Sequence, residues 1–226
     1  MAAFDIKTLQ LETERLILRP PRLEDFNAWA GFLADEEATR FIGGLQNRAL
    51  AWRTFMCMCG CWHMTGIAMF SVIEKATGKW VGRLGPWFPE GWPQEEVGWG
   101  IAREHWGKGY ATEGATAAMD FAFYVLGWPE VIHCIHVDNK ASQGVAKRLG
   151  SRNLRRVTMP VPFQDMPVDA WGRPARSGAP ASRSDCPRLL GIGDCPRYGN
   201  ALPPACGNPQ RPPSASRIRD ADRYRS

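Results

Sequence analysis

The sequence predicts a mixed α/β domain in which one central sheet carries helices on both of its faces. Apolar residues follow a helical period in the first third of the chain, an alternating period in the middle, and strand-then-helix units after residue 110. Of the 226 residues, 44% are apolar and 23% are charged, which is the balance of a globular protein. No apolar run reaches the roughly 20 residues that a bilayer span needs.

The first elements are predicted from apolar spacing and from the residues that end helices and strands. The strand Leu16–Arg19 stops at Pro20, because proline cannot donate a hydrogen bond to a sheet. Apolar residues at helical spacing predict a helix over Leu23–Leu33. A short helix follows at Glu36–Ile42, ended by a pair of glycines, and a longer helix follows at Arg48–Met64.

The middle of the chain has the shorter period of β-structure. The first two strands are separated by the turn Ala76-Thr77-Gly78, which indicates a hairpin. The predicted strands are Ile67–Glu74, Lys79–Trp87 and Glu95–Ile101.

After residue 110, helices and strands alternate. The strongest helix is Ala111–Leu126, which Gly127 and Pro129 terminate. The elements that follow are a strand at Val131–Val137, a helix at Ala141–Leu149, and closing strands at Val157–Phe163 and Val168–Trp171.

The composition changes abruptly at residue 173, so we predict a folded domain at residues 1–172 and a disordered tail at residues 173–226. The tail holds 10 arginines and 4 aspartates, whereas residues 1–172 hold 18 basic and 19 acidic residues, so the net charge of +5 comes from the tail. The tail also lacks Lys, Glu, Phe, Trp, Met and Val. One hypothesis for its origin is sequence read out of frame; the alternative is a natural Arg-rich arm that binds anionic partners.

The cysteines fit a reducing compartment and do not indicate a metal site. Cys57, Cys59 and Cys61 alternate in a predicted helix, and His63 follows them. Structural zinc sites instead use pairs spaced C-x-x-C, so the favoured interpretation is small buried helix residues, and no metal is expected. Cys134 stands alone in an apolar strand with no neighbour in sequence to activate it as a nucleophile.

The stretch from Glu95 to Gly114 carries the strongest chemical signal. A strand runs into a loop with Gly107 and Gly109, and a long helix begins within this loop. The unpaired amides of a first helical turn, together with the positive end of the helix dipole, form a site for an anion such as pyrophosphate. Neither the P-loop spacing nor the G-x-G-x-x-G fingerprint is met here. An ordinary glycine-rich connection is the structural alternative.

Three segments together resemble the GNAT N-acetyltransferase superfamily, in the branch of ribosomal-protein N-terminal acetyltransferases. WGKGYA, from Trp106 to Ala111, is similar to the coenzyme A loop [Q/R]-x-x-G-x-[G/A], with Trp106 in place of Gln or Arg. VDNKASQGVAKRLG, beginning at Val137, resembles the following strand and helix, and LETERLILRP resembles the first strand. The resemblance covers Leu11 to about Trp171 and implies a mostly antiparallel sheet.

The resemblance implies acetyl-CoA as co-substrate and assigns residues to it. Backbone groups of Gly100, Ile101 and Ala102 would pair with pantetheine where two neighbouring strands splay apart. Asn139 would contact the pantetheine arm, and Ser142 would lie near the thioester sulfur as the proton donor to the leaving thiolate. Many relatives use a tyrosine on this last helix, and none occurs between Asn139 and Gly150. The pyrophosphate would be held by amides of Gly107, Lys108, Gly109, Tyr110, Ala111 and Thr112.

A carboxylate is expected to act as general base, because most alkyl amines are protonated at pH 7 and attack only when neutral. Glu96 is the candidate, with Glu95 on the opposite face of the strand. The alternative for Glu96 is a solvent-facing strand glutamate. His133 and His136 lie on opposite strand faces and are interpreted as structural.

The predicted function is an acetyl-CoA-dependent N-acetyltransferase that moves acetyl directly to a primary amine, either a protein N-terminus or a small molecule. The alternatives are a non-catalytic coenzyme- or partner-binding module of the same fold, and nucleic-acid binding through the Arg-rich tail. No membrane partner is expected, and homodimer formation is left open. The opening residues MAAFDIKTLQ lack the layout of a secretory signal, so a cytoplasmic location is expected.

Overall fold

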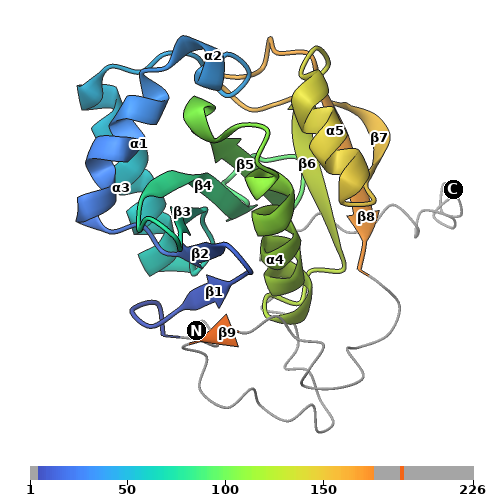
Figure 1. Ribbon diagram of the computed structural model, residues 1–226. Helices are drawn as coiled ribbons and strands as arrows, with labels where there is room; N and C mark the ends of the chain where they lie inside the picture. The colour runs from blue at the N-terminus through green and yellow to red at the C-terminus, as the bar shows by residue number, and fades with distance from the viewer. Residues whose placement is uncertain (1–4, 176–188, 191–226) are drawn as a thin grey trace, which may run out of the picture. The chain divides into compact units, whose positions relative to one another are not determined.

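One mixed sheet organises the part of the chain that the structure, a computed structural model, describes: residues 5–175 and 189–190 (Figure 1). Its strands follow the order β7-β8-β6-β5-β4-β3-β2-β1-β9. They are β1 Gln10–Glu12, β2 Leu16–Arg19, β3 Phe70–Glu74, β4 Trp80–Trp87, β5 Glu96–Ile101, β6 Glu130–His136, β7 Arg152–Val157, β8 Val168–Pro174 and β9 Leu189–Leu190. Neighbours are antiparallel except for β5 and β6, which run parallel.

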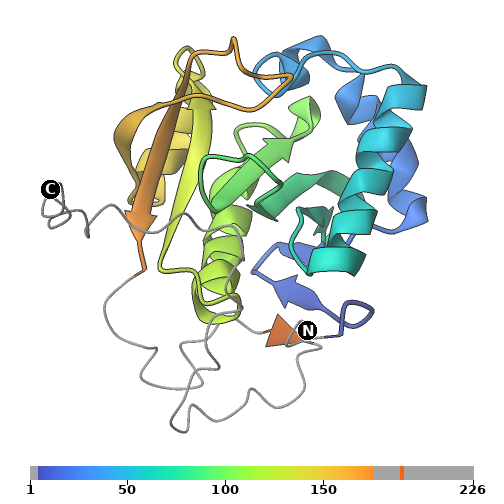
Figure 2. The ribbon, with the colours of Figure 1, turned by 180° about the vertical axis from the view of Figure 1, so that it is seen from behind.

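Helices cover both faces of this sheet, as Figures 1 and 2 show from opposite sides. They are α1 Phe26–Leu33, α2 Glu36–Thr39, α3 Arg48–Thr65, α4 Tyr110–Tyr124 and α5 Lys140–Arg148, with 3-10 turns at Leu23–Asp25 and Arg103–His105. The first three helices lie on one face, and α4 and α5 lie on the other. The predicted mixed α/β fold, mostly antiparallel with helices on both faces, is confirmed.

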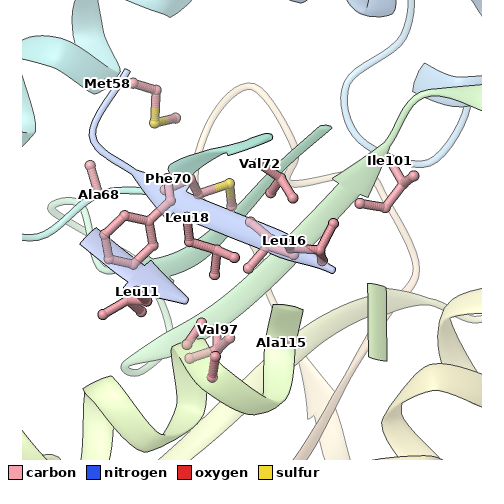
Figure 3. Close-up of a cluster of buried hydrophobic side chains, with 14 of the residues drawn as sticks. Leu11, Leu16, Leu18, Met58, Ala68, Phe70, Val72, Val97, Ile101 and Ala115 are labelled. Carbon is pink, nitrogen blue, oxygen red and sulfur yellow. The ribbon is translucent and has the colours of Figure 1, made fainter. Parts of the chain in front are cut away.

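The core forms where α4 packs on the middle strands. Val97 of β5 lies beside Ala115 of α4, and both side chains are fully buried (Figure 3). Small residues on α4 allow the helix to approach the sheet closely. At Gly114, a Cβ would come within 2.6 Å of Leu84 on β4. Close packing at this face fixes the position of the amino end of α4 relative to the end of β5.

Most predicted elements are confirmed with shifts of a few residues at their ends. The strand at Leu16–Arg19 is confirmed without change, and the predicted helix at Arg48–Met64 extends by one residue. The predicted helix at Leu23–Leu33 is divided into a 3-10 turn and α1. Buried Asp25 lies at this junction and pairs with Arg19 at 2.7 Å, and it also accepts a hydrogen bond from Ser71.

The prediction of a strand at Val157–Phe163 is wrong. The strand is β7, Arg152–Val157, and the chain leaves the sheet after it. Five of the six β7 residues are exposed, so this edge strand lacks the apolar alternation that would reveal it in the sequence. Pro160 and Pro162 cannot donate ladder hydrogen bonds, which explains why residues 158–163 are not a strand. The short β1 was not predicted.

The predicted domain boundary at residue 172 falls inside β8, which continues to Pro174. The predicted tail, residues 173–226, lies outside the described residues except for Arg173–Ala175 and the two residues of β9, which pair with β1. The described residues belong to one compact unit, residues 1–193. Among them, no helix has the length and hydropathy required to cross a membrane.

We predict opposite stability effects for alanine at two glycines. In Gly82→Ala on β4, the new Cβ would lie 2.5 Å from the carbonyl oxygen of Gly100, so β4 and β5 must separate. We expect a loss of about 1–3 kcal/mol in the free energy of unfolding. The control, Gly60→Ala, lies on α3 with nothing within 4 Å, and we expect a gain of about 1 kcal/mol from helix propensity. Urea unfolding measures both values, and equal values would contradict the packing argument.

Candidate active site

The parallel strands β5 and β6 pair at one position only, Glu96 with Ile132. There the Ile132 amide donates to the Glu95 carbonyl at 2.9 Å. On its other edge β5 pairs with β4 over its whole length. Beyond Glu96 the two parallel strands therefore separate and leave one edge of β5 without a neighbouring strand.

Alternation along β5 decides which backbone groups face this open edge. The Ala102 amide donates to the Val81 carbonyl at 2.9 Å, so the backbone groups of Gly100 and Ala102 face β4. Those of Trp99 and Ile101 face the open edge. Of the three residues predicted to pair with pantetheine, only Ile101 presents its backbone there, and the sequence analysis missed Trp99.

Trp106 closes part of the open edge. Its indole Nε1 donates to the Ile101 carbonyl at 2.7 Å, so the residue that replaces Gln or Arg in the loop pattern ties the loop to the end of β5. No described residue accepts from the Ile101 amide or bonds to the backbone of Trp99 on this edge. These groups remain available to an extended ligand.

The amino terminus of α4 lies at the end of the loop that follows β5. Gly107 and Gly109 have φ values of 76° and 82°, which favour glycine, and Gly109 is the N-cap residue of α4. Within the described residues, no acceptor pairs with the amides of Lys108, Gly109, Tyr110, Ala111 and Thr112. A Cβ on Gly107 would meet nothing within 4 Å, so the loop surface is open. The predicted anion site thus has both the donors and the space that it requires.

An ion pair that the sequence analysis missed holds this loop in place. Arg15 donates to the Lys108 carbonyl at 2.9 Å and lies 2.6 Å from the carboxylate of Glu113 on α4. Thr13 also donates to that carboxylate, at 2.6 Å. Burial alone would raise the pKa of Glu113, but the hydrogen bonds from Thr13 and Arg15 outweigh it and lower the pKa below its usual value. These residues lie in LETERLILRP, whose resemblance was noted only for its strand.

The side chains of the loop turn in different directions. Tyr110 is buried and its hydroxyl donates to Glu74, so this residue offers a ligand only its amide. Lys108 keeps an exposed ammonium 3.3 Å from His105 Nδ1. One lysine charge therefore stands beside the unpaired amides.

Glu96 lies at the point where β5 and β6 separate, and it is only 6% exposed. Its Oε1 accepts from the Cys134 amide at 2.9 Å, and its Oε2 accepts from the Trp92 indole at 2.5 Å. Burial raises the pKa of Glu96 to about 7, although the hydrogen bonds from Cys134 and Trp92 and the Arg83 charge act in the opposite direction. Such a carboxyl is about half ionised at neutral pH and can accept a proton. The alternative of a solvent-facing glutamate does not fit this burial.

Ser142 and Asn139 meet at the amino end of α5. The Asn139 side-chain oxygen caps the helix by accepting from the Ser142 amide at 3.0 Å. The amide NH2 of Asn139 then remains available to donate to a ligand. The Ser142 hydroxyl accepts from the Trp99 indole at 3.2 Å and retains its own proton for donation. Trp99 thus joins α5 to the open edge of β5.

His133 is buried in the gap between the diverging strands. Its Nδ1 lies 2.7 Å from the Val97 carbonyl, which can only accept, and its Nε2 lies 3.0 Å from the Ser151 hydroxyl. Burial lowers the pKa of His133 to about 4, so the ring is neutral. These contacts agree with the structural interpretation of this residue.

Among the described cysteines, Cys134 is a poor nucleophile, and none belongs to a metal-binding cluster. Burial, with Glu96 beside it, raises the pKa of the Cys134 thiol far above its usual value. Cys57 is exposed on α3, and Cys59 and Cys61 are half-buried, so the prediction of small buried residues holds only in part. In the described part of the chain, no three His, Cys, Asp or Glu residues are grouped so that they could hold a metal ion.

Comparison with known proteins identifies relatives of this architecture. The family model described as an acetyltransferase (GNAT) domain matches residues 15–152. The uncharacterized protein YkkB of Bacillus subtilis is 34% identical over 101 residues, which are 42% of this chain and 59% of that protein.

Solved structures share the fold over most of the described chain. An acetyltransferase from Agrobacterium tumefaciens has 30% sequence identity and a TM-score of 0.64, covering 74% of this chain and 94% of that one. RimJ of Mycobacterium smegmatis, solved in complex with a CoA-disulfide, has 17% identity and a TM-score of 0.55, covering 74% of this chain and 86% of its own. At that identity, the likeness to RimJ shows the fold alone.

The neutral His133 ring predicts a specific acid sensitivity. The folded pKa of about 4 lies below the unfolded value of 6.5, so the unfolded state binds a proton that the folded state excludes. His133 therefore lowers the free energy of unfolding by about 2 kcal/mol between pH 7.5 and pH 5. Glu96 acts with the opposite sign in this range, because its pKa is raised on folding. The informative quantity is therefore the difference between His133→Gln and the parent.

Urea unfolding at both pH values measures this difference. His133→Gln should lose the acid-dependent part of the destabilisation, whatever its stability at pH 7.5. The control, His63→Gln at an exposed position of α3, should keep the slope of the parent. A slope that is the same in all three proteins would show that His133 is not held neutral.

Proposed function

Because this chain belongs to the GNAT family of acetyltransferases, we propose that it transfers the acetyl group of acetyl-CoA directly to a primary amine. One observation carries the proposal. Because β5 and β6 pair at a single position, one edge of β5 is open, and this edge leads to the unpaired amides at the amino terminus of α4. An extended amide-bearing arm that ends in a pyrophosphate matches this sequence of donors and acceptors.

The coenzyme roles follow from the groups that remain unpaired. Pantetheine pairs with the backbone of Ile101 and Trp99 along the open edge, while Gly100 and Ala102 hold β5 to β4. The amides from Gly107 to Thr112 bind the pyrophosphate, with Lys108 adding a positive charge. Asn139 reaches the arm through its amide NH2.

Glu96 serves as the general base. It takes the proton from the ammonium of the acceptor, directly or through a water, and the neutral nitrogen then attacks the thioester carbonyl. Hydrogen bonds from the Cys134 amide and the Trp92 indole fix the carboxylate, and burial matches its pKa to neutral pH. A base whose pKa lies near the working pH is both ionised and basic enough to act.

Ser142 completes the transfer. As the new C–N bond forms and the C–S bond breaks, the leaving thiolate takes a proton from the Ser142 hydroxyl, and the serine oxygen regains a proton from the attacking nitrogen, which loses its second proton on becoming an amide. This hydroxyl is oriented by the Trp99 indole, which donates to its oxygen and so directs the serine proton elsewhere. The acceptor is a protein N-terminus or a small-molecule amine, and both present the same nucleophile.

Coenzyme A is expected to stabilise the protein against thermal unfolding. At a coenzyme concentration of 100 times Kd, the gain is about 2.7 kcal/mol. In Gly107→Ala, the methyl group blocks the close approach of phosphate, so this gain should shrink by at least half. The matched control is Gly44→Ala, because both glycines have φ near 75° (76° and 74°) and both have nothing within 4 Å. Differential scanning fluorimetry should show similar loss of stability in both variants but reduced protection in Gly107→Ala only.

A rise of kcat/KM with pH, with an apparent pKa near 7, is expected because Glu96 must be ionised to act. Glu96→Gln should lower kcat by about 10²–10⁴-fold and abolish this rise, while coenzyme protection persists. Glu95→Gln is the control, since Glu95 adjoins Glu96 in sequence and is expected on the opposite strand face. Release of free thiol from acetyl-CoA gives the rates. Coenzyme protection without thiol release for any amine would instead support a non-catalytic coenzyme-binding module.

A further inference from the structure

Arg83 of β4 carries a charge that the proposed chemistry leaves without a partner. Within the described residues its hydrogen bond runs from Nη1 to the Met69 sulfur at 2.8 Å, and its Nε is buried without an acceptor. The guanidinium lies 5.6 Å from the ring centre of Trp29. A thioether is a weak acceptor, and arginine in a partly buried place usually pairs with a carboxylate.

Glu96 does not neutralise this charge. No ion pair within 4.0 Å joins Arg83 to any carboxylate in the described ranges. Burial lowers the pKa of Arg83 to about 10, with the charge of Glu96 opposing this effect, so the guanidinium is protonated at neutral pH. The two groups are near enough to interact, yet both keep capacity for another partner.

Two glycines of β5, Gly98 and Gly100, lie beside Arg83 and Glu96. Gly100 is the cross-strand partner of Arg83, and Gly98 lies between Gly100 and Glu96 on the same strand face. A Cβ on Gly98 would fall 2.8 Å from the Met69 methyl carbon and 3.4 Å from Glu96 Oε1. A Cβ on Gly100 would fall 2.8 Å from the Phe32 ring. These two glycines form a floor, here called the glycine floor, over which the side chains of Met69, Phe32 and Ile42 pack.

Met69 both covers Gly98 and accepts the hydrogen bond from Arg83. Its methyl carbon lies over Gly98 and its sulfur accepts from Arg83. Methionine is flexible and adapts at low cost, so it can move aside when a better acceptor arrives. A carboxylate would replace one weak contact with a charge-assisted, bidentate pair.

We propose that Arg83 binds a carboxylate of the acceptor, and that the acceptor is therefore a small amine of the amino-acid type. This inference rests on the proposed function. The ammonium of such a zwitterion meets Glu96, its carboxylate displaces the Met69 sulfur from Arg83, and its carbon skeleton takes the place of the Met69 methyl group over Gly98. A protein N-terminus has no carboxylate beside its amine and would leave Arg83 unpaired, which is costly for a partly buried charge.

The test compares free amino acids with their carboxamides as acceptors, with thiol release from acetyl-CoA as the readout. We expect the parent to favour the acid over the matched amide by at least about tenfold in kcat/KM. In Arg83→Gln this ratio, measured above the pH midpoint of each protein, should fall to about one, mainly through a higher KM for the acid. Arg83→Lys should keep part of the preference because it keeps the charge.

Two further variants make the test independent of the stability of Arg83→Gln. Met69→Leu removes the competing sulfur at similar volume, so the preference for acids should be maintained or increased. Arg53→Gln, at an exposed position of α3, is the control and should leave all ratios unchanged. Protection of the coenzyme-loaded protein by amino acids in thermal unfolding gives a second readout that does not depend on turnover.

The outcomes separate the inference from the proposed function. If Arg83 acts only on Glu96, Arg83→Gln will shift the pH midpoint equally for acids and amides and leave their ratio intact, which would overturn the inference. Equal use of acids, amides and peptide N-termini by the parent would also overturn it while the acetyltransferase activity stands. The absence of both thiol release and coenzyme protection would instead reject the proposed function.

Discussion

The separation of two parallel strands after a single paired position is the constraint on which this molecule depends. At Glu96 and Ile132 the strands still pair, and beyond that point side chains replace the ladder. The Glu96 carboxylate accepts a hydrogen bond from the Cys134 amide, and the His133 ring donates one to the Val97 carbonyl. Buried backbone groups must be paired. These two side chains bond to backbone groups that the separated strands leave unpaired, and so they stabilise the divergence of β5 and β6.

The same contacts set the chemistry of Glu96. A carboxylate that accepts two hydrogen bonds would ordinarily have a low pKa, but here burial is the larger effect and raises the pKa to about 7. The hydrogen bonds therefore serve mainly to orient the group and to limit the rise. Glu96 thus helps to keep β5 and β6 separate and, in the proposed reaction, receives the proton of the acceptor ammonium.

Local features of the sequence predict much of this site. Gly107 and Gly109 have the positive φ that only glycine adopts easily, so the loop and the start of α4 follow from residues that are neighbours in the chain. The position of Glu96 on its strand follows from alternation. The choice between the two edges of β5 does not, because it depends on the register with β4. For this reason the sequence predicted Gly100 and Ala102 at the open edge, whereas the backbone groups of Trp99 and Ile101 face it.

Contacts between distant segments leave no periodic signal. Arg15 and Glu113 are 98 positions apart, and neither residue type indicates the other in the sequence. Arg83 and Met69 lie on different elements, so the weak acceptor of this arginine emerges only from the folded chain. The edge strand β7 is exposed and charged, so burial left no pattern in it. A periodic pattern predicts which residues face the core, and these contacts do not involve residues that follow such a pattern.

In the proposed reaction, one edge of β5 would bind the coenzyme and one face of β5 would bind the acceptor. Main-chain groups at its open edge would hold the coenzyme, whereas Glu96, Gly98 and Gly100 share one of its faces, on which Glu96 and Gly98 would meet the acceptor. Since backbone donors are the same for every residue except proline, substitutions on that face can alter the acceptor without changing the groups offered to the coenzyme. The opposite face, with Val97 packed on α4, is fixed by the core. In the proposed reaction, specificity for the acceptor would therefore reside in the side chains around the glycine floor, where Arg83 has the weak Met69 sulfur as its acceptor.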